Sequence, residues 1–329
     1  MRAIVCHTPG QLSDLVVEEV ADLKVRPGQV KVAVEAAGVN YVDALFVEGR
    51  YQIKPNPPFT PGSEVAGVVV ELGEGVTSLN LGDRVLASPG LGGFAEHVVV
   101  AASACSVLPA VLTSTAAACF TQSYSTALYT YLHRVHLKPG ERVLVLGGGG
   151  GVGLAAIRVG VALGATVYAA ASTEEKRAAA LAAGATAVFD GDPEQLKQTI
   201  RTGIEGGIDV VIDPVGGPST EACLRNLRDG GRLAVIGFAS GPIPALPSNL
   251  VLLRNRSLVG VDWGIWAMTN GEKQGEILSQ LLDMVATGVI EVDEPTTCDF
   301  TRGVEALSDL LGRRVVGKIA LVPSRNGES

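Results

Sequence analysis

Short apolar runs separated by glycine and proline turns characterise the first hundred residues. Five of these runs have the length and composition of strands, at residues 3–6, 30–35, 65–71, 84–87 and 94–100. Pairs such as Pro27-Gly28 and Pro61-Gly62 place a φ-restricted residue beside a φ-permissive one, where the chain must reverse. One short helix, at about residues 40–48, interrupts the strands. The pattern predicts an all-β region of barrel or sandwich type.

The pattern changes from about Thr121, where strands begin to alternate with long alanine-rich helices. Six strands are expected at residues 144–146, 166–169, 187–189, 210–212, 233–236 and 258–261. Such alternation is typical of parallel βαβ units in a doubly wound sheet. A helix at 275–286 and a final strand at 317–322 do not extend it, so we expect them to return to the first domain. The sequence therefore predicts an α/β protein with one domain at residues 1–121 and 267–329 and another at residues 122–266.

A glycine-rich turn follows the first strand of the second domain. The buried-strand pattern at residues 142–146 leads directly into a glycine run and then a helix at 154–163. The G-x-G-x-x-G frame falls on Gly148, Gly150 and Gly153, with Gly151 and Val152 between the last two. In this context the glycines allow close backbone approach, and the helix start offers free N–H groups to a pyrophosphate. The turn predicts a dinucleotide site, and the simpler alternative is a merely flexible glycine turn.

The end of the next strand indicates which dinucleotide is bound. A site that selects NAD has a carboxylate there for the ribose 2′-hydroxyl, whereas this strand continues from residues 166–171 into Ser172. Lys176 and Arg177 follow, and with Ser172 they can hydrogen-bond and neutralise a 2′-phosphate. We therefore predict NADPH. In the alternative interpretation, Ser172 and Glu175 form a capping box and the two cations are solvated surface charges. Both interpretations can hold together.

Charge and cysteine content exclude several classes of partner. The formal charge of −8 is spread along the chain, and no cluster of Lys and Arg forms a face for nucleic acid. The apolar runs are much shorter than the roughly 20 residues that span a bilayer, and no signal segment opens the chain. The five cysteines are odd in number and widely separated, which predicts neither a disulfide framework nor a Cys-x-x-Cys metal clip. We expect a cytoplasmic protein that contacts neither nucleic acid nor membrane.

Several segments together resemble the medium-chain dehydrogenase/reductase superfamily along almost the whole chain. They lie at residues 36–43, 60–67, 82–85, 148–153 and 213–216, and the first two are most similar to its quinone oxidoreductase branch, the zeta-crystallin-like proteins. The resemblance implies a GroES-like, partly open β-barrel catalytic domain followed by a Rossmann domain, with the C-terminus returning to the barrel. It also implies a homodimer formed by edge pairing of the strand at 258–261.

The resemblance implies that no metal is bound. Zinc-dependent members carry a cysteine where this chain has Asn40 and a histidine where it has Ser63. A third ligand, a cysteine, would fall near Ala118, with Cys119 one position away, and one thiolate cannot form the three-ligand catalytic zinc site. The four cysteines of a structural zinc site are also absent between residues 88 and 103.

Candidate site residues follow from the same resemblance. Asn40, Asp43 and Tyr51 match positions beside the nicotinamide, where Asn40 is expected to orient an oxygen of the substrate. Tyr51 either donates a hydrogen bond or proton or is an amphipathic tyrosine at a rim, and Asp43 either contributes to catalysis or only caps the short helix. Gln122 and Tyr124 are weaker candidates. Further expected cofactor contacts are Thr126, Gly237, Phe238, Val261 and Lys318. For Lys318 the alternative is a solvated strand terminus.

Without a Lewis acid, the expected reaction is hydride transfer to an acceptor that is already electron-poor, a quinone or another conjugated carbonyl compound. The alternative within enzymes is an enoyl reductase acting on a 2-enoyl thioester or an enone. A site for an acyl thioester is expected to have basic residues at the entrance of its cleft. The tract at residues 50–59 has only two basic residues, Arg50 and Lys54, which disfavours this alternative. A lower-ranked alternative is a non-catalytic structural or RNA-binding role, which the acidic balance disfavours.

Overall fold

The computed structural model describes residues 1–323. Its contacts divide the chain into two compact units, Met1–Gln122 with Val292–Ser329 and Ser123–Glu291. The expected boundary at residue 121 is thus displaced by one position, whereas the expected boundary at residue 266 differs by 25 residues, because the helices that follow it cluster with the second unit.

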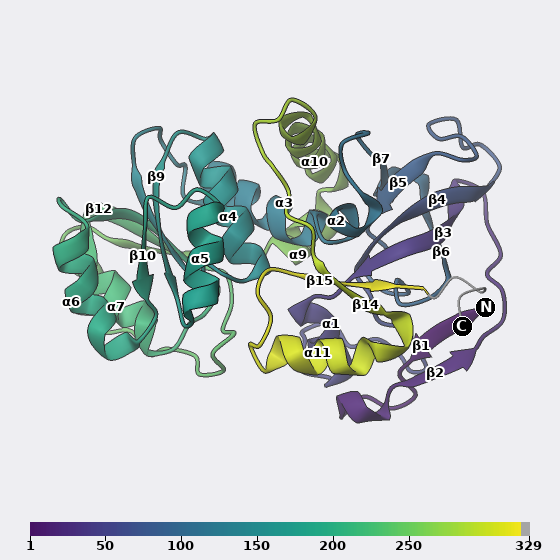
Figure 1. Ribbon diagram of the computed structural model, residues 1–329, viewed down its shortest axis with the longest axis horizontal. Coiled ribbons are helices and arrows are strands. Elements are labelled where there is room, and N and C mark those ends of the chain that lie inside the picture. Colours follow the sequence, from purple (N-terminus) through teal and green to yellow (C-terminus); the bar gives the residue numbers. More distant parts are fainter. Residues whose placement is uncertain (324–329) are drawn as a thin grey trace. The chain divides into compact units, whose positions relative to one another are not determined.

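The first unit contains the expected short strands. Strands β1 (Arg2–Val5) and β2 (Val16–Glu19) form an antiparallel pair. A seven-stranded sheet has the order β14-β15-β3-β4-β5-β7, with β6 paired to β3 (Figure 1). Its strands are β3 (Gln29–Gly38), β4 (Glu64–Leu72), β5 (Arg84–Ala87), β6 (His97–Ala101), β7 (Cys105–Val107), β14 (Thr296–Asp299) and β15 (Ile319–Val322). Alternating apolar residues of β3 and β4, including Val30, Val32, Val65 and Val69, fill the core with Phe94.

The helices of the first unit are short. They are α1 (Tyr41–Val47), α2 (Ser114–Ala118) and α11 (Gly303–Leu311), with 3-10 turns at Leu12–Asp14, Ala102–Ala104 and Phe300–Arg302. Strand β15 returns to this unit as expected, since it pairs antiparallel with β3 through Ala320 opposite Gly38 and Leu321 opposite Ala37.

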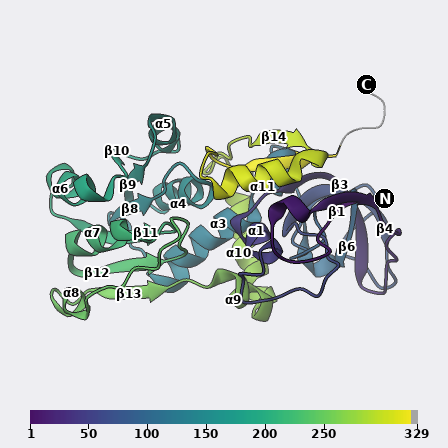
Figure 2. The ribbon, with the colours of Figure 1, turned by 90° about the horizontal axis from the view of Figure 1, so that it is seen from below.

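The second unit is built on a six-stranded parallel sheet of order β10-β9-β8-β11-β12-β13, which confirms the doubly wound expectation (Figure 2). The strands are β8 (Arg142–Leu146), β9 (Thr166–Ala171), β10 (Ala187–Asp190), β11 (Ile208–Asp213), β12 (Leu227–Val235) and β13 (Ser257–Gly260). The strand order reverses between β8 and β11, and ligands of such sheets bind at the carboxyl ends of the strands near this point.

The second unit is rich in helices. They are α3 (Thr121–Tyr129, whose first two residues belong to the first unit), a π-helix (Thr130–Arg134), α4 (Gly151–Ala162), α5 (Glu174–Ala182), α6 (Pro193–Gly203), α7 (Pro218–Asn226), α8 (Ser248–Leu252), α9 (Trp263–Thr269) and α10 (Gly271–Ala286). Across residues 1–323, the helices are too short or too polar to cross a membrane.

Helices α9 and α10 belong to the second unit for a specific reason. The side chain of Gln274 donates from Nε2 to Ser125 Oγ (3.0 Å) and accepts at Oε1 from the Trp263 indole (2.8 Å). These two bonds join α10 to α3 and to α9, and Ile277, Leu281 and Val285 bury the apolar face of α10.

Candidate functional site

The glycine turn lies where the sequence predicted it, between the end of β8 at Leu146 and the start of α4 at Gly151. The first amide groups of an α-helix have no acceptor within the helix, and the helix dipole adds partial positive charge there. The amides of Gly151, Val152 and Gly153 occupy this first turn of α4. They can therefore bind an anion.

Two glycines of the turn differ in role, as the space available to an added Cβ atom on each of them shows. A Cβ on Gly153 would lie 2.2 Å from the carbonyl oxygen of Gly147, so a side chain there forces the strand and the helix apart. A Cβ on Gly150 would find its nearest protein atom at 3.5 Å, which is ordinary contact. Packing therefore requires glycine at position 153. At position 150 packing would allow a side chain, and glycine instead leaves the backbone open to the approach of a ligand. This arrangement fits the pyrophosphate of a dinucleotide.

The end of β9 carries the residues expected to select the cofactor. Ser172 is exposed, and Thr173 caps α5 by accepting from the Lys176 amide (3.2 Å). The alternative interpretation, in which Ser172 caps this helix, was therefore wrong, because the helix begins one residue later. Arg177 is held in place by the carbonyl of Ala171 (3.0 Å) and by Asp190 (2.9 Å). Ser172, Lys176 and Arg177 lie close together in the chain at the carboxyl end of β9.

Other expected cofactor residues lie in the same unit. Gly237 and Phe238 follow β12, and Val261 follows β13, where its amide donates to Val235 (2.9 Å). Thr126 is buried in α3. The buried Asp213 fixes the turn after β11 by accepting from the amides of Val215 (2.9 Å) and Gly216 (2.8 Å) and from the hydroxyl of Thr220 (2.6 Å). The turns after β11 and β12 and the residue after β13 thus lie at the carboxyl edge of the sheet.

A polar cluster in the first unit contains Asn40, Asp43, Ser63, Glu64 and Lys318, which we call the Lys318 cluster. Asn40 is the N-cap of α1, and its amide donates to Asp43 Oδ2 (2.8 Å) in a capping box. The Asn40 side chain donates from Nδ2 to Glu64 Oε1 (2.8 Å) and accepts at Oδ1 from Lys318 Nζ (2.5 Å). Both ends of this carboxamide are therefore engaged by charged neighbours.

Lys318 was expected to contact a cofactor phosphate, and the structure gives its ammonium a different environment. Its Nζ lies 3.0 Å from Glu64 Oε1, and the side chains of the two residues are 13% and 2% exposed. The second carboxylate oxygen of Glu64 accepts from the Gln122 amide (2.9 Å). The ammonium is thus held within its own unit by a buried carboxylate, so the alternative of a solvated strand terminus was wrong, and the phosphate contact stays a prediction.

Other predicted residues have varied outcomes. Tyr51 packs edge-on against Phe46, with ring centroids 5.0 Å apart.

Cys119 donates to the carbonyl of Ile319 (3.4 Å), and burial raises the pKa of its thiol to about 12. Glu64 was missed as a site residue, although a carboxylate at the start of an apolar strand was a usable signal. Residues 1–323 hold no group of three His, Cys, Asp or Glu side chains arranged for a metal ion.

Burial raises the pKa of Asp43 from 3.8 to about 7, against the lowering effects of the Asn40 amide, Lys318 and Ser63. A carboxyl that stays protonated longer in the folded state binds more protons than the unfolded chain, so stability falls as pH rises. The contribution of the protonated Asp43 carboxyl to the free energy of unfolding is fully present below about pH 4 and is lost as pH rises through about 7.

We therefore predict that Asp43→Asn flattens the pH dependence of stability between about pH 4 and 7, because asparagine keeps an oxygen for the Asn40 amide but does not ionise. Urea denaturation at several pH values measures this. Parallel curves for the variant and the wild type would contradict the assignment.

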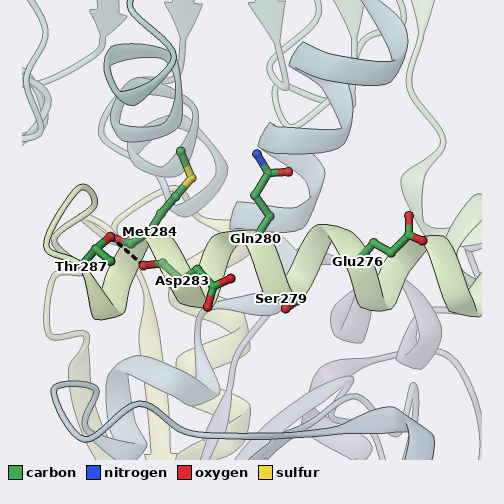
Figure 3. A pocket seen from close by; sticks show the side chains of 6 residues that line it. All are labelled: Glu276, Ser279, Gln280, Asp283, Met284 and Thr287. Carbon is green, nitrogen blue, oxygen red and sulfur yellow. Dashed lines mark hydrogen bonds between the residues drawn. The ribbon is translucent and has the colours of Figure 1, made fainter.

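A hollow on α10 shares no residue with the glycine turn or with the Lys318 cluster. Five side chains of this helix and its C-cap residue Thr287 line it; the five are Glu276, Ser279, Gln280, Asp283 and Met284 (Figure 3). Thr287 donates from Oγ1 to the carbonyl of Asp283 in the last turn of α10 (2.7 Å). None of the predicted site residues lies in this hollow, so we do not assign the site to it.

Comparison with known proteins agrees with this architecture. The model of the alcohol dehydrogenase GroES-like domain matches residues 26–110, and that of the zinc-binding dehydrogenase family matches residues 151–280. The Bos taurus quinone oxidoreductase-like protein 2 is 36% identical over 309 residues, which are 93% of this chain and 88% of the relative.

Two solved structures are similar over nearly the whole chain. Escherichia coli quinone oxidoreductase complexed with NADPH has a TM-score of 0.87 and 27% identity, covering 98% of this chain and 100% of its own. A mycobacterial protein complexed with NADPH has a TM-score of 0.90 and 31% identity, with the same coverage. These matches confirm the expected GroES-like and Rossmann folds. The chain belongs to the quinone oxidoreductase-like proteins, oxidoreductases of the medium-chain dehydrogenase/reductase family.

Proposed function

We propose that this chain is an NADPH-dependent oxidoreductase that reduces a quinone without zinc. The observation that carries the proposal is the end of β9, where Ser172, Lys176 and Arg177 replace the carboxylate of an NAD site, beside a glycine turn that fits a pyrophosphate. The NADPH complexes of two similar proteins support the same cofactor. When bound, NADPH supplies a hydride from C4 of its nicotinamide.

The cations at the start of α5 give the first test. Lys176→Ala and Arg177→Ala are each expected to weaken NADPH binding about tenfold to a hundredfold, since a hydrogen bond to a charged group contributes about 1.5–3 kcal/mol. NADH binding should be unchanged because it has no 2′-phosphate. Fluorescence titration measures both affinities, with Lys197→Ala on α6 as an exposed control. Equal losses for the two cofactors would argue against a 2′-phosphate site.

Zinc independence rests on the chemistry of the Lys318 cluster. Asn40 and Ser63 are neutral, and an ammonium lies among them, paired to Glu64, so a divalent cation would meet a positive charge. The thiol of Cys119 stays protonated at neutral pH, because burial raises its pKa to about 12. Elemental analysis of the purified protein tests this point, and stoichiometric zinc would overturn it.

The acceptor class is tested by NADPH oxidation with a panel of quinones, enones and 2-enoyl thioesters. We expect quinones to give the highest kcat/KM. A clear preference for thioesters would keep the fold and the cofactor site but make the protein an enoyl reductase. No oxidation with any acceptor would favour a non-catalytic role, for which salt-sensitive RNA binding is the next assay.

We also propose a homodimer formed through β13. This strand is an edge of the six-stranded sheet, and apolar side chains are exposed on it and nearby, with Leu258 at 42%, Leu253 at 58% and Leu252 at 77%. An uncovered edge strand with such neighbours favours pairing with a second copy. Light scattering should give twice the chain mass of 33.9 kDa, and Leu258→Lys should shift it toward one chain. A wild-type monomer would contradict the dimer.

A cytoplasmic location is part of the proposal. All five cysteines are free, and Cys6, Cys119 and Cys223 are buried as small apolar residues. Free thiols persist in a reducing compartment. Recovery of the protein in the membrane or secreted fraction of its source cells would contradict this location.

A further inference from the structure

The first turn of α5 packs directly on the glycine turn within the second unit. A Cβ atom on Gly149 would lie 2.4 Å from Cβ and 2.7 Å from Cα of Lys176. These two atoms form the base of the lysine, so no rotation of its side chain relieves the contact. The G-x-G-x-x-G frame leaves position 149 open to any residue, and the close approach of α5 is what requires glycine there. The helix turn that carries Lys176 and Arg177 is therefore fixed beside the glycine turn.

Arg177 is also held by the ends of two neighbouring strands. Its Nη1 donates to the carbonyl of Ala171 (3.0 Å), which ends β9, and to Oδ2 of Asp190 (2.9 Å), which ends β10. Ala171 and Asp190 are partners in the register of these two parallel strands. The other carboxylate oxygen of Asp190 accepts from the Asp192 amide (3.0 Å), so the anchor is itself fixed. The guanidinium is therefore held in place before any cofactor binds.

The anchored guanidinium keeps donors for a ligand. An arginine side chain carries five N–H groups, and acceptors among residues 1–323 engage the two on Nη1 of Arg177. The three on Nε and Nη2 remain, on a side chain that is 25% exposed. Guanidinium groups bind phosphate oxygens through pairs of N–H groups. Arg177 can therefore bind a phosphate without releasing its anchor.

The remaining donors of Arg177 lie where a 2′-phosphate is expected. Strand β9 is the neighbour of β8 in the sheet, and in doubly wound sheets the end of this second strand faces the ribose that carries the 2′-group. Arg177 is bonded to Ala171, the last residue of β9. A dinucleotide whose pyrophosphate binds the glycine turn thus presents its 2′-group to the first turn of α5.

We propose that Asp190 is a positioning residue that makes the site selective for NADPH, because it holds Arg177 ready for the 2′-phosphate. This inference rests on the proposed function. A carboxylate repels a phosphate, so the charge of Asp190 alone disfavours NADPH. Its anchoring of Arg177 acts in the opposite direction, since a side chain that is already ordered loses less entropy when the ligand binds. Anchoring outweighs repulsion because Asp190 is exposed and water and salt screen its charge.

Asp190→Ala tests the proposal directly, because repulsion and anchoring predict opposite results. Removal of the charge alone should tighten NADPH binding, whereas loss of the anchor should weaken it. We expect NADPH affinity to fall about threefold to tenfold, the cost of ordering one long side chain on binding, with NADH affinity unchanged. Fluorescence titration of the intact chain measures both affinities. Tighter or unchanged NADPH binding would overturn the proposal.

Glu175→Ala is the matched control, since it removes the same charge from the first turn of α5. Glu175 is exposed and is not an anchor of Arg177, whose acceptors are Ala171 and Asp190. Its loss should leave NADPH binding unchanged or slightly tighter. Equal losses of NADPH affinity in Glu175→Ala and Asp190→Ala would mean that anchoring is not the cause.

A double variant shows whether Asp190 acts through Arg177. In the Arg177→Ala background the carboxylate has no guanidinium to hold, so adding Asp190→Ala should weaken NADPH binding no further. Because only the repulsion is then removed, the affinity should stay the same or rise. A further threefold to tenfold loss in the double variant would contradict the positioning role.

The wild-type chain separates this inference from the proposed function. If the wild type binds NADPH no more tightly than NADH, the 2′-phosphate site of the proposed function fails, and the role of Asp190 fails with it. If the wild type prefers NADPH and Asp190→Ala keeps the same ratio of the two dissociation constants, the site stands and the role of Asp190 alone is refuted.

Discussion

Replacing Gly153 with alanine is expected to weaken NADPH binding about tenfold to a hundredfold and to lower the melting temperature. The new Cβ would lie 2.2 Å from the carbonyl oxygen of Gly147 and 2.9 Å from Cα of Gly148, so the turn and α4 must separate. Overpacking of this kind costs about 1–3 kcal/mol, and the displaced helix start loses its alignment with the pyrophosphate. Fluorescence titration and thermal unfolding measure the two effects.

Gly150→Ala is the matched control within the same turn. Its Cβ would meet no protein atom closer than 3.5 Å, and the φ of −95° at this position suits alanine, so the melting temperature should stay near wild type. NADPH affinity should still fall, because the methyl group covers backbone that a pyrophosphate approaches. Unchanged NADPH affinity in Gly150→Ala would show that the dinucleotide does not bind at this turn.

Replacing Glu64 with alanine is expected to reduce the free energy of unfolding by about 3 kcal/mol, the lower end of the range for breaking a buried ion pair, because Lys318 is partly exposed. The substitution leaves the Lys318 ammonium without its carboxylate, and the Gln122 amide and the Asn40 side chain lose an acceptor. Denaturation monitored by circular dichroism measures the change.

Glu71 on the same strand is the control for this prediction. It pairs with Lys31 at 2.9 Å, but its side chain is 49% exposed. Surface ion pairs of this type contribute at most about 1 kcal/mol, so Glu71→Ala should have a small effect. Similar losses for Glu64→Ala and Glu71→Ala would mean that the Lys318 cluster is not a buried ion-pair network.

The main strands could be predicted because their apolar positions are strong local signals. Strand β3 has valines at alternate positions, β4 and β8 contain runs of apolar residues, and the glycine turn follows β8 directly. Strands β2, β7 and β14 were missed because they are short and contain no fully buried residue, so no apolar pattern distinguishes them from loops. Their pairing depends on partners elsewhere in the sheet rather than on their own composition.

The site could be predicted only in part, for a related reason. The glycine turn and the residues after β9 are local in sequence, and both were identified from spacing. The Lys318 cluster joins residues 278 positions apart, from Asn40 to Lys318, and no local pattern encodes such a contact. The placement of α10 likewise depends on Gln274 reaching Ser125, which is 149 positions away.

The central claim is metal-free reduction of a quinone by NADPH. The most direct test is the rate of NADPH oxidation by chelator-treated protein with a 1,4-benzoquinone, with NADH run in parallel. The account predicts turnover with NADPH that chelation does not reduce, and a much lower kcat/KM with NADH. Absence of turnover with NADPH, or activity that returns only when zinc is added, would contradict it.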